Sequence, residues 1–152
     1  DTCPLEEAEE RLEQAVADGS GLNALKEMIR AQGGNPDVCD DTSLLPAAKQ
    51  CYPIEASRSG SIASMDTDRI GIAALLLGAG RRTKEDEIDP AVGIWMKKRL
   101  GDSVKEGEPL ADFYVNKEEN LEEAVAEFQQ AIHIETGSAA KPELIRKIIE
   151  SK

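Results

Sequence analysis

The sequence has few aromatic residues, a single histidine and no long apolar run. Phe, Tyr and Trp make up 3% of its 152 residues, so Leu, Ile, Val and Ala must build most of any core. Its most apolar stretch, Ile70 to Leu77, is far too short to span a membrane, and no segment resembles a signal peptide. We therefore expect a cytoplasmic protein that has no membrane partner.

Positive charge is limited as well. The chain has 18 Lys and Arg residues against 30 Asp and Glu, which gives a net charge of −12. Nucleic acids and anionic membranes bind positive surfaces, so neither is an expected partner. The three cysteines, Cys3, Cys39 and Cys51, match no zinc or redox spacing and are interpreted as reduced cytosolic thiols.

The first 45 residues are predicted to form two amphipathic helices. In the first, apolar residues share one face and several glutamates share the opposite one, which we interpret as a solvated face rather than a metal site. Ser20 is predicted to cap the second helix. The predicted buried stripe of this helix consists of Leu22, Leu25, Met28 and Ile29. Leu44 and Leu45 are predicted to anchor an irregular connection to the next domain.

Alternating apolar residues predict strands in the remainder of the chain. Tyr52 to Ala56 and a segment that begins at Ile62 are predicted to pair as a hairpin around a turn at residues 58–60. A second predicted hairpin joins Val92–Met96 to Leu110–Val115 through the segment GDSVKEGEPL. A further short strand is predicted at residues 132–135.

Two more helices are predicted between these strands. The first covers residues 70–77 and is expected to be buried on most sides. Asp66 or Thr67 is predicted to cap it, and Gly78 with Gly80 to stop it. The apolar face of the second consists of Leu121, Ala124, Val125, Phe128 and Ala131.

The order of several segments resembles the pyrimidine-nucleoside phosphorylases, the family that includes thymidine phosphorylase. The central segments are LLLGAGRRTKEDEIDPAVGI and GDSVKEGEPLADFYVN. They are preceded by LKEMIRAQGGNPDVCDD and KQCYPIEASRSGSIASMDTDRIGIAA, and followed by NLEEAVAEFQQAIHI and KPELIRKII. The resemblance covers nearly the whole chain and is weakest over Asp1 to Gly19.

This resemblance implies an α+β fold. Residues 1–45 would be helices from the end of the family's large α/β domain. Residues 46–152 would form its C-terminal α/β-hammerhead domain, with antiparallel strands, a buried helix and an amphipathic helix. The last segment, residues 144–149, has helical spacing, but the resemblance implies a closing strand, which we predict. Because the chain begins at Asp1 without a methionine, we expect a fragment of a longer protein, produced by design or by proteolysis.

The resemblance also implies a parent enzyme. Members of this family cleave pyrimidine nucleosides with inorganic phosphate to give the free base and a pentose 1-phosphate, so the parent would be a phosphorolytic pentosyltransferase. They are homodimers that use phosphate as co-substrate, often with a potassium ion. The expected partners are therefore the remainder of the parent enzyme and, bound by that parent, pyrimidine nucleoside and phosphate.

The sequence lacks the motifs that carry the family's chemistry. It has neither the lysine-anchored phosphate loop, rich in glycine and serine, nor the base-binding stretch, and both lie upstream in the family. We therefore assign no catalytic, cofactor-binding or metal-binding residue. The chain by itself is predicted to be inactive and to have a supporting, structural role.

Four groups of residues could suggest a site, but each has a simpler interpretation. His133 lies between two isoleucines and is expected to be an ordinary exposed histidine without a catalytic partner. Gly78 to Arg82 follow a helix, where carbonyl groups gather, so they are interpreted as a helix end and not as a phosphate loop. Lys97 to Arg99 are interpreted as charges at an exposed strand end. The remaining group, Ser57, Arg58, Ser59 and Ser61, resembles a phosphate-binding set only superficially and is not assigned.

Three alternatives stay open beside this interpretation. The chain could be a free-standing binding or scaffold module, or part of an archaeal-type nucleotide phosphorylase with the same C-terminal design. The GDSVKEGEPL hairpin also resembles the turn of biotinyl and lipoyl carrier domains. Their modified lysine is missing from its place here, and the nearby Lys117 has the wrong neighbours.

Overall fold

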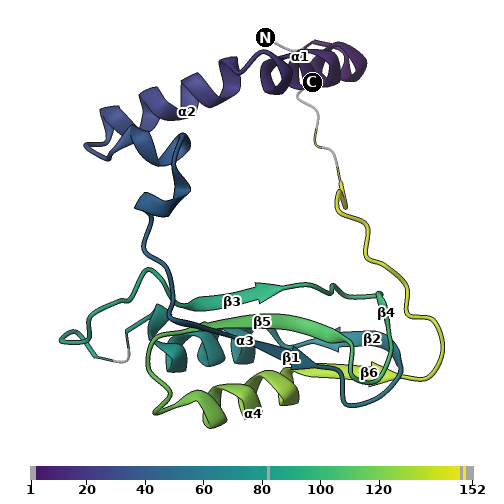
Figure 1. Cartoon of the computed structure of the whole chain (residues 1–152). Helices are drawn as coiled ribbons and strands as arrows, with labels where there is room; N and C mark the ends of the chain where they lie inside the picture. Colours follow the sequence, from purple (N-terminus) through teal and green to yellow (C-terminus); the bar gives the residue numbers. More distant parts are fainter. Residues whose placement is uncertain (1–2, 82, 148, 150–152) are drawn as a thin grey trace. The chain divides into compact units, whose positions relative to one another are not determined.

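A computed structural model describes residues 3–81, 83–147 and 149 (Figure 1). The chain divides into two compact units, Asp1–Pro46 and Ala47–Lys152. The first contains helices alone, whereas the second combines helices with two small antiparallel sheets. The predicted α+β class is confirmed. The assignment of residues 1–45 to the end of a large α/β domain stays a prediction.

The first unit contains two α-helices and two short 3-10 turns. Helix α1 spans Leu5–Ala17 and α2 spans Ser20–Ala31, which confirms the two predicted helices. The turns η1 and η2 span Pro36–Cys39 and Thr42–Leu44. The predicted cap at Ser20 is wrong, because Ser20 is already helical and Gly19, at a φ of 77°, occupies the cap position.

No described residue of this first unit is buried. The predicted buried stripe of α2 is therefore wrong for this chain, since Leu22, Leu25 and Met28 are all more than 40% exposed. Leu44 and Leu45 are about half exposed as well, so they anchor nothing within the described residues. Two helices and two short turns do not provide an apolar layer that could cover these side chains.

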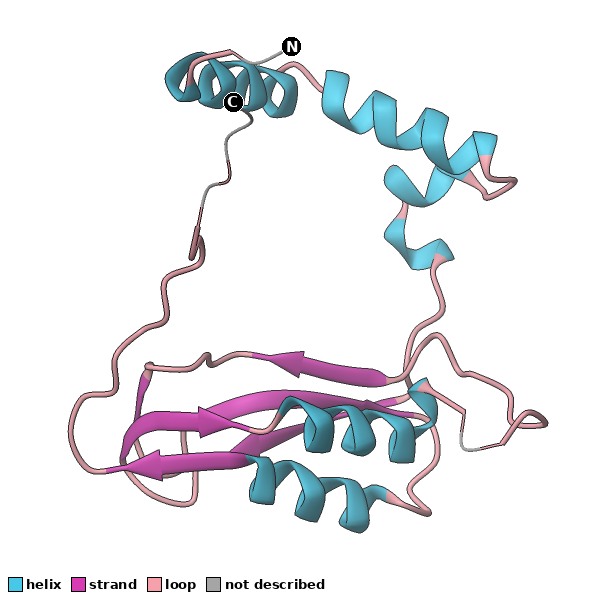
Figure 2. Cartoon of the chain, turned by 180° about the vertical axis from the view of Figure 1, so that it is seen from behind, coloured by secondary structure: helices cyan, strands magenta, loops and turns pink. Residues whose placement is uncertain are grey.

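The second unit is built from two three-stranded antiparallel sheets (Figures 1 and 2). The first has the order β1-β5-β3, with bounds Gln50–Glu55, Pro109–Val115 and Gly93–Met96. The second has the order β4-β2-β6, with bounds Ser103–Val104, Gly60–Met65 and Ile132–Glu135. The predicted pairing of the Val92–Met96 and Leu110–Val115 segments is confirmed by β3 and β5.

The predicted hairpin between β1 and β2 is wrong, because the two strands belong to different sheets. The chain between them is held by the turn that precedes β5. The amide of Ala56 donates to the Glu108 carbonyl, and the amide of Gly107 donates to the Ala56 carbonyl, both at 2.9 Å. The Ser59 hydroxyl accepts from the Glu106 amide, also at 2.9 Å. These bonds direct β1 to β5 and leave β2 to pair with β4 and β6.

Helix α3 spans Thr67–Ala74 and continues as a π-helical turn, η3, over Leu75–Ala79. The predicted cap at Asp66 is confirmed, since its carboxylate accepts from the amides of Asp68 and Arg69 at 3.1 and 3.2 Å. Gly78 ends the helix with a φ of 103°, a conformation that favours glycine. The expectation of burial on most sides is wrong, because Ile72 is 48% exposed. One face of α3 packs on the core, and the other faces solvent.

Helix α4, Leu121–Ala131, confirms the predicted amphipathic helix and holds the centre of the core. Its Phe128 meets Phe113 of β5 edge to face, with ring centroids 5.3 Å apart, and both side chains are fully buried. Helices α3 and α4 lie together on one side of the β1-β5-β3 sheet (Figures 1 and 2). The last turn of α4 leads directly into β6, so the same helix connects both sheets.

The predicted closing strand is wrong where the structure describes it. Residues 141–147 and 149 form neither strand nor helix, and Ile148 lies outside the described residues. Lys141 is bound to Asp102 at 2.7 Å, and beyond it the chain leaves the sheet, with Leu144 97% exposed. Within the described ranges, no helix is both long enough and apolar enough to cross a membrane.

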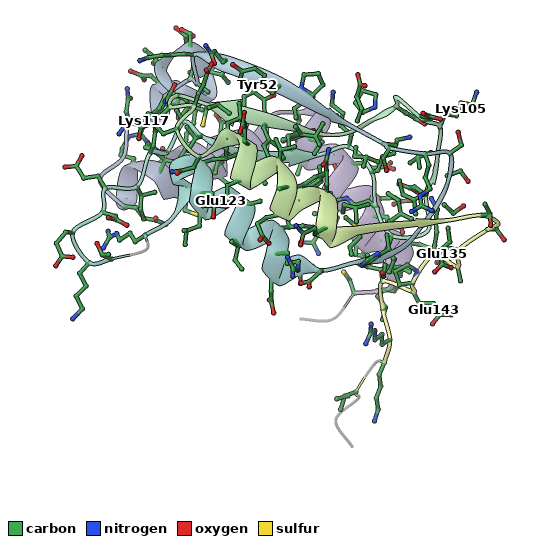
Figure 3. All side chains as sticks on the ribbon, turned by 90° about the horizontal axis from the view of Figure 1, so that it is seen from below. Tyr52, Lys105, Lys117, Glu123, Glu135 and Glu143 are labelled. Carbon is green, nitrogen blue, oxygen red and sulfur yellow. The ribbon has the colours of Figure 1, made fainter. Side chains whose placement is uncertain are left out.

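Truncating Phe128 to alanine should be the most damaging change to α4. Because the side chain is fully buried against Phe113, Phe128→Ala is expected to lower the free energy of unfolding by about 3–5 kcal/mol. Chemical denaturation followed by circular dichroism measures this. Glu123→Ala, on the exposed face of the same helix (Figure 3), should change it by no more than about 0.5 kcal/mol. Equal losses in the two variants would contradict the assigned core.

Candidate functional site

An open groove of about 730 Å³ runs beside β6 and the ends of α3 and α4. It collects polar side chains from two stretches that are far apart in the sequence, residues 57–69 and 129–135. The residues that line it are Ser57, Arg58, Ser64, Asp66, Arg69, Gln129, Gln130, Ile132, His133, Ile134 and Glu135. Because it holds two arginines and the only histidine of the chain, this groove is the candidate site of the second unit.

Strand register brings His133 into the groove. Along β6, Ile132 and Ile134 are buried and His133 is exposed, as the predicted alternation requires. Ser64 of β2 lies directly opposite His133 in the antiparallel pair. Neither side chain has a hydrogen-bond partner among the described residues. Among the described residues, no carboxylate is hydrogen-bonded to His133 in the way that orients a catalytic histidine.

The arginine at the helix end is already engaged. Nη1 of Arg69 donates to Oε2 of Glu127 at 2.8 Å and to Oε1 of Gln130 at 2.9 Å. Its Nε lies 3.7 Å from Oδ2 of Asp66. These contacts fasten α3 to α4, so the Arg69 side chain acts first as a structural link.

The other cation of the groove, Arg58, is exposed and has no ion pair within the described part of the chain. Two carboxylates, Asp66 and Glu135, line the same groove. The two arginines and two carboxylates balance, so the groove is not a strongly positive anion site. Sequence reasoning missed Arg69, which carried no motif, and its partners Glu127 and Gln130 lie 58 and 61 positions away.

The structure separates the serines that the sequence placed near one another. Ser57 lines the groove beside Arg58. Ser59 accepts a backbone hydrogen bond from Glu106 instead, and Ser61 is 3% exposed, with its hydroxyl 3.5 Å from that of Ser103. The four residues therefore do not surround a common point.

The basic run after β3 is paired with carboxylates. Nζ of Lys97 lies 2.8 Å from Oδ1 of Asp112, and Lys98 binds Glu108. The glycines of residues 78–82 sit at a helix end, where the Gly78 carbonyl accepts from the Asp89 amide at 3.0 Å. Arg82 lies outside the described residues. The amides of Lys97 and Lys98 donate to the Leu110 carbonyl, and that of Arg99 donates to Asp102, so this basic run does not present free amides to an anion as a phosphate loop does.

The Glu108 carboxylate stabilises the turn before β5. The Glu108 carboxylate accepts from the Lys98 ammonium and from the Lys105 amide, and these bonds hold its pKa below the usual value of 4.5. Lys105 lies on this turn, whereas Lys117 lies at the opposite end of the unit (Figure 3). Lys117 therefore does not occupy the position of a carrier lysine at the hairpin.

Comparisons with known proteins identify the family. Residues 61–135 match the family model described as the pyrimidine nucleoside phosphorylase C-terminal domain. The chain is 43% identical over 145 residues to a pyrimidine-nucleoside phosphorylase of Bacillus subtilis (strain 168). It is 42% identical over 145 residues to that of Staphylococcus haemolyticus (strain JCSC1435) and 43% identical over 141 residues to that of Geobacillus stearothermophilus.

The chain belongs to the pyrimidine-nucleoside phosphorylase family. It corresponds to the C-terminal portion, as the matched domain shows. The alignments with the three relatives cover 95%, 95% and 93% of this chain, but 33%, 33% and 32% of the relatives. The chain therefore spans about a third of the length of the curated relatives that it matches.

The ion pair between Glu108 and Lys98, at the turn before β5, is predicted to weaken in acid. A carboxyl whose pKa is lowered on folding stabilises the fold above its usual pKa, and this stability is lost as the pH falls through the lower, folded value. In wild type, the free energy of unfolding should therefore decrease as the pH falls below 4.5, partly through Glu108. Glu108→Gln removes this share, so its unfolding free energy should depend less on pH in that window.

Urea denaturation at a series of pH values measures both curves. The matched control is Glu106→Gln, because the Glu106 side chain is exposed on the same turn and makes no ion pair in the part of the chain that is described. This control should keep the wild-type pH dependence. Parallel curves for wild type and Glu108→Gln would rule out the contact as a source of acid sensitivity.

Proposed function

We propose that this chain is the C-terminal portion of an enzyme that cleaves pyrimidine nucleosides with phosphate, giving the free base and a pentose 1-phosphate. The observation that carries the proposal is the alignment of 95% of the chain with a relative named pyrimidine-nucleoside phosphorylase at 43% identity. The whole enzyme is expected to be a cytoplasmic homodimer that uses phosphate as co-substrate, often with a potassium ion.

The role proposed for this portion is structural support, without catalytic groups of its own. Phosphorolysis joins a phosphate dianion to a sugar while a base leaves as an anion, so the site needs a surplus of positive, hydrogen-bond-donating groups. The groove beside β6 balances Arg58 and Arg69 with Asp66 and Glu135. Arg69 is further neutralised by Glu127. This balance of charge in the groove supports a structural role for this portion.

The exposed helices of the first unit support the same role. Leu5, Leu12 and Val16 of α1 are 74%, 68% and 83% exposed, and the apolar residues of α2 are exposed too. An amphipathic helix without a cover leaves apolar surface in water, which is unfavourable. We propose that the rest of the parent enzyme covers these faces.

The proposal is tested by completing the enzyme. The upstream two-thirds of the Bacillus subtilis relative would be joined to this chain at the aligned boundary. The fusion is expected to release uracil from uridine or thymine from thymidine in the presence of phosphate. Neither the 152-residue chain nor the upstream part alone should do so. Chromatography of the free base, with and without phosphate, measures the reaction.

Two results would count against the proposal. Release at an enzymatic rate by the chain alone would mean that it holds a complete site, and the groove with His133 would then be the first place to examine. A folded fusion that releases no base from either nucleoside would contradict the proposed reaction. The positive control is the intact Bacillus subtilis relative, in which the same upstream part is followed by its own C-terminal third.

A further inference from the structure

The β1-β5-β3 sheet has one face on the core and one face that no described element of the second unit covers. Side chains alternate between the two faces of a strand, so Phe113 of β5, which meets α4, marks the inner face. The outer face is formed by Cys51 and Pro53 of β1, Asp112 and Tyr114 of β5, and Trp95 of β3. Helices α3 and α4 both lie on the opposite side of this sheet (Figures 1 and 2).

The outer face is more apolar than a water-facing sheet needs to be. Trp95 is 66% exposed and Tyr114 is 38% exposed, so two of the chain's five aromatic residues lie on this face instead of in the core. Pro53 and Cys51 are exposed beside them. A solvated face of an antiparallel sheet normally carries polar side chains, whereas Trp and Tyr are enriched where proteins meet.

The strand register makes these residues one continuous surface. Trp95 lies opposite Asp112, which lies opposite Pro53 on the other edge strand. In the next row, Tyr114 lies between Cys51 and Gly93, which has no side chain. The single charge in the middle, Asp112, is only 16% exposed and is bound by Lys97 at 2.8 Å. The surface is therefore an apolar patch whose one carboxylate is already paired.

The length of the relatives and the point at which the chain enters this sheet indicate what covers the outer face. About two-thirds of the length of each relative lies outside this chain. The polypeptide that precedes the second unit reaches it at β1, an edge strand of this same sheet. The Lys49 amide donates to Oδ1 of Asn116 at 2.8 Å, which fixes that approach to the end of β5. The preceding part of a longer enzyme would thus connect to this sheet at its β1 edge, the strand that carries Cys51 and Pro53 of the outer face.

We propose that the outer face of the β1-β5-β3 sheet, defined by Cys51, Pro53, Trp95, Asp112 and Tyr114, is the surface on which the upstream portion of a pyrimidine-nucleoside phosphorylase docks. The occupant is an apolar surface of that upstream portion, and Trp95 is the central side chain that it covers. The inference rests on the proposed function, because it requires such a portion to exist.

Trp95 is the only tryptophan of the chain, so its fluorescence shows whether this side chain is covered. Its emission in the fusion is obtained as the difference between the fusion and its Trp95→Phe variant, which removes any signal from the upstream part. We expect this emission to be shifted to shorter wavelength and protected from iodide in the fusion. In the 152-residue chain alone, it should be that of an indole in water.

The thiol of Cys51, on the same face, gives an independent measurement. Its alkylation should be slower by about tenfold or more in the fusion than in the chain alone, because a covered group reacts only when the cover opens. The matched control is a Glu106→Cys, Cys51→Ser double variant, in which the thiol lies on the exposed turn before β5. This thiol should react at the same rate in both proteins.

A substitution separates docking from folding. Because Trp95 is exposed in the chain alone, Trp95→Glu should leave the unfolding midpoint of the 152-residue chain unchanged but lower that of the fusion. Ile72→Glu provides the control, since Ile72 is also half exposed but lies on α3, away from this face. It should not lower the midpoint of the fusion in the same way.

The outcomes separate this inference from the proposed function. An active fusion in which Trp95 stays exposed overturns the docking surface and leaves the enzyme assignment intact. A fusion that covers Trp95 but releases no base supports the surface and counts against the reaction. Protection that is already present in the 152-residue chain, or that rises with its concentration and accompanies a dimer in sedimentation, assigns the face to another occupant and overturns the proposal.

Discussion

The second unit depends on the contact between Phe113 and Phe128. Phe113 belongs to the central strand of one sheet, and Phe128 belongs to the helix that leads directly into an edge strand of the other sheet. Their fully buried rings thus hold two small sheets around one core, in a sequence that has only two phenylalanines. Small sheets need an apolar face or a packed helix to be stable, and this shared core supplies both. The groove, the closed turn and the outer face of the sheet all take their positions from it.

The parts of the fold that could be predicted are those with a periodic apolar pattern. Residues of β3, β5 and β6 alternate, and α4 repeats its apolar residues at helical spacing, because each has one face on the same core. The partner of β1 could not be predicted in this way. It is decided by backbone bonds between Ala56 and the turn at residues 107–108, and backbone bonds leave no side-chain pattern. A strand of two residues, such as β4, is too short to show any period.

The candidate groove was harder to predict, because its residues come from two distant stretches of the chain and share no motif. His133 was visible as an exposed strand residue, but the arginine at the helix end became relevant only once α3 and α4 were placed side by side. The family, in contrast, is visible in the segments around the turn before β5. This difference has a physical reason: those segments carry the backbone and charge contacts on which the fold depends, whereas the residues that line the groove come together only in the folded chain.

The two units differ in what holds them together. The second has a buried core of its own, and its exposed apolar patch on the outer sheet face is an addition to a structure that is already stable. The first has no buried residue within 3–46 and is about as short as the smallest domains that fold without a metal or disulfide. Isolated helices of 12 or 13 residues are marginal in water. Helical order in the first unit therefore depends on surface supplied from outside it, and a longer chain that covers α1 and α2 would stabilise the part of this protein that most needs support.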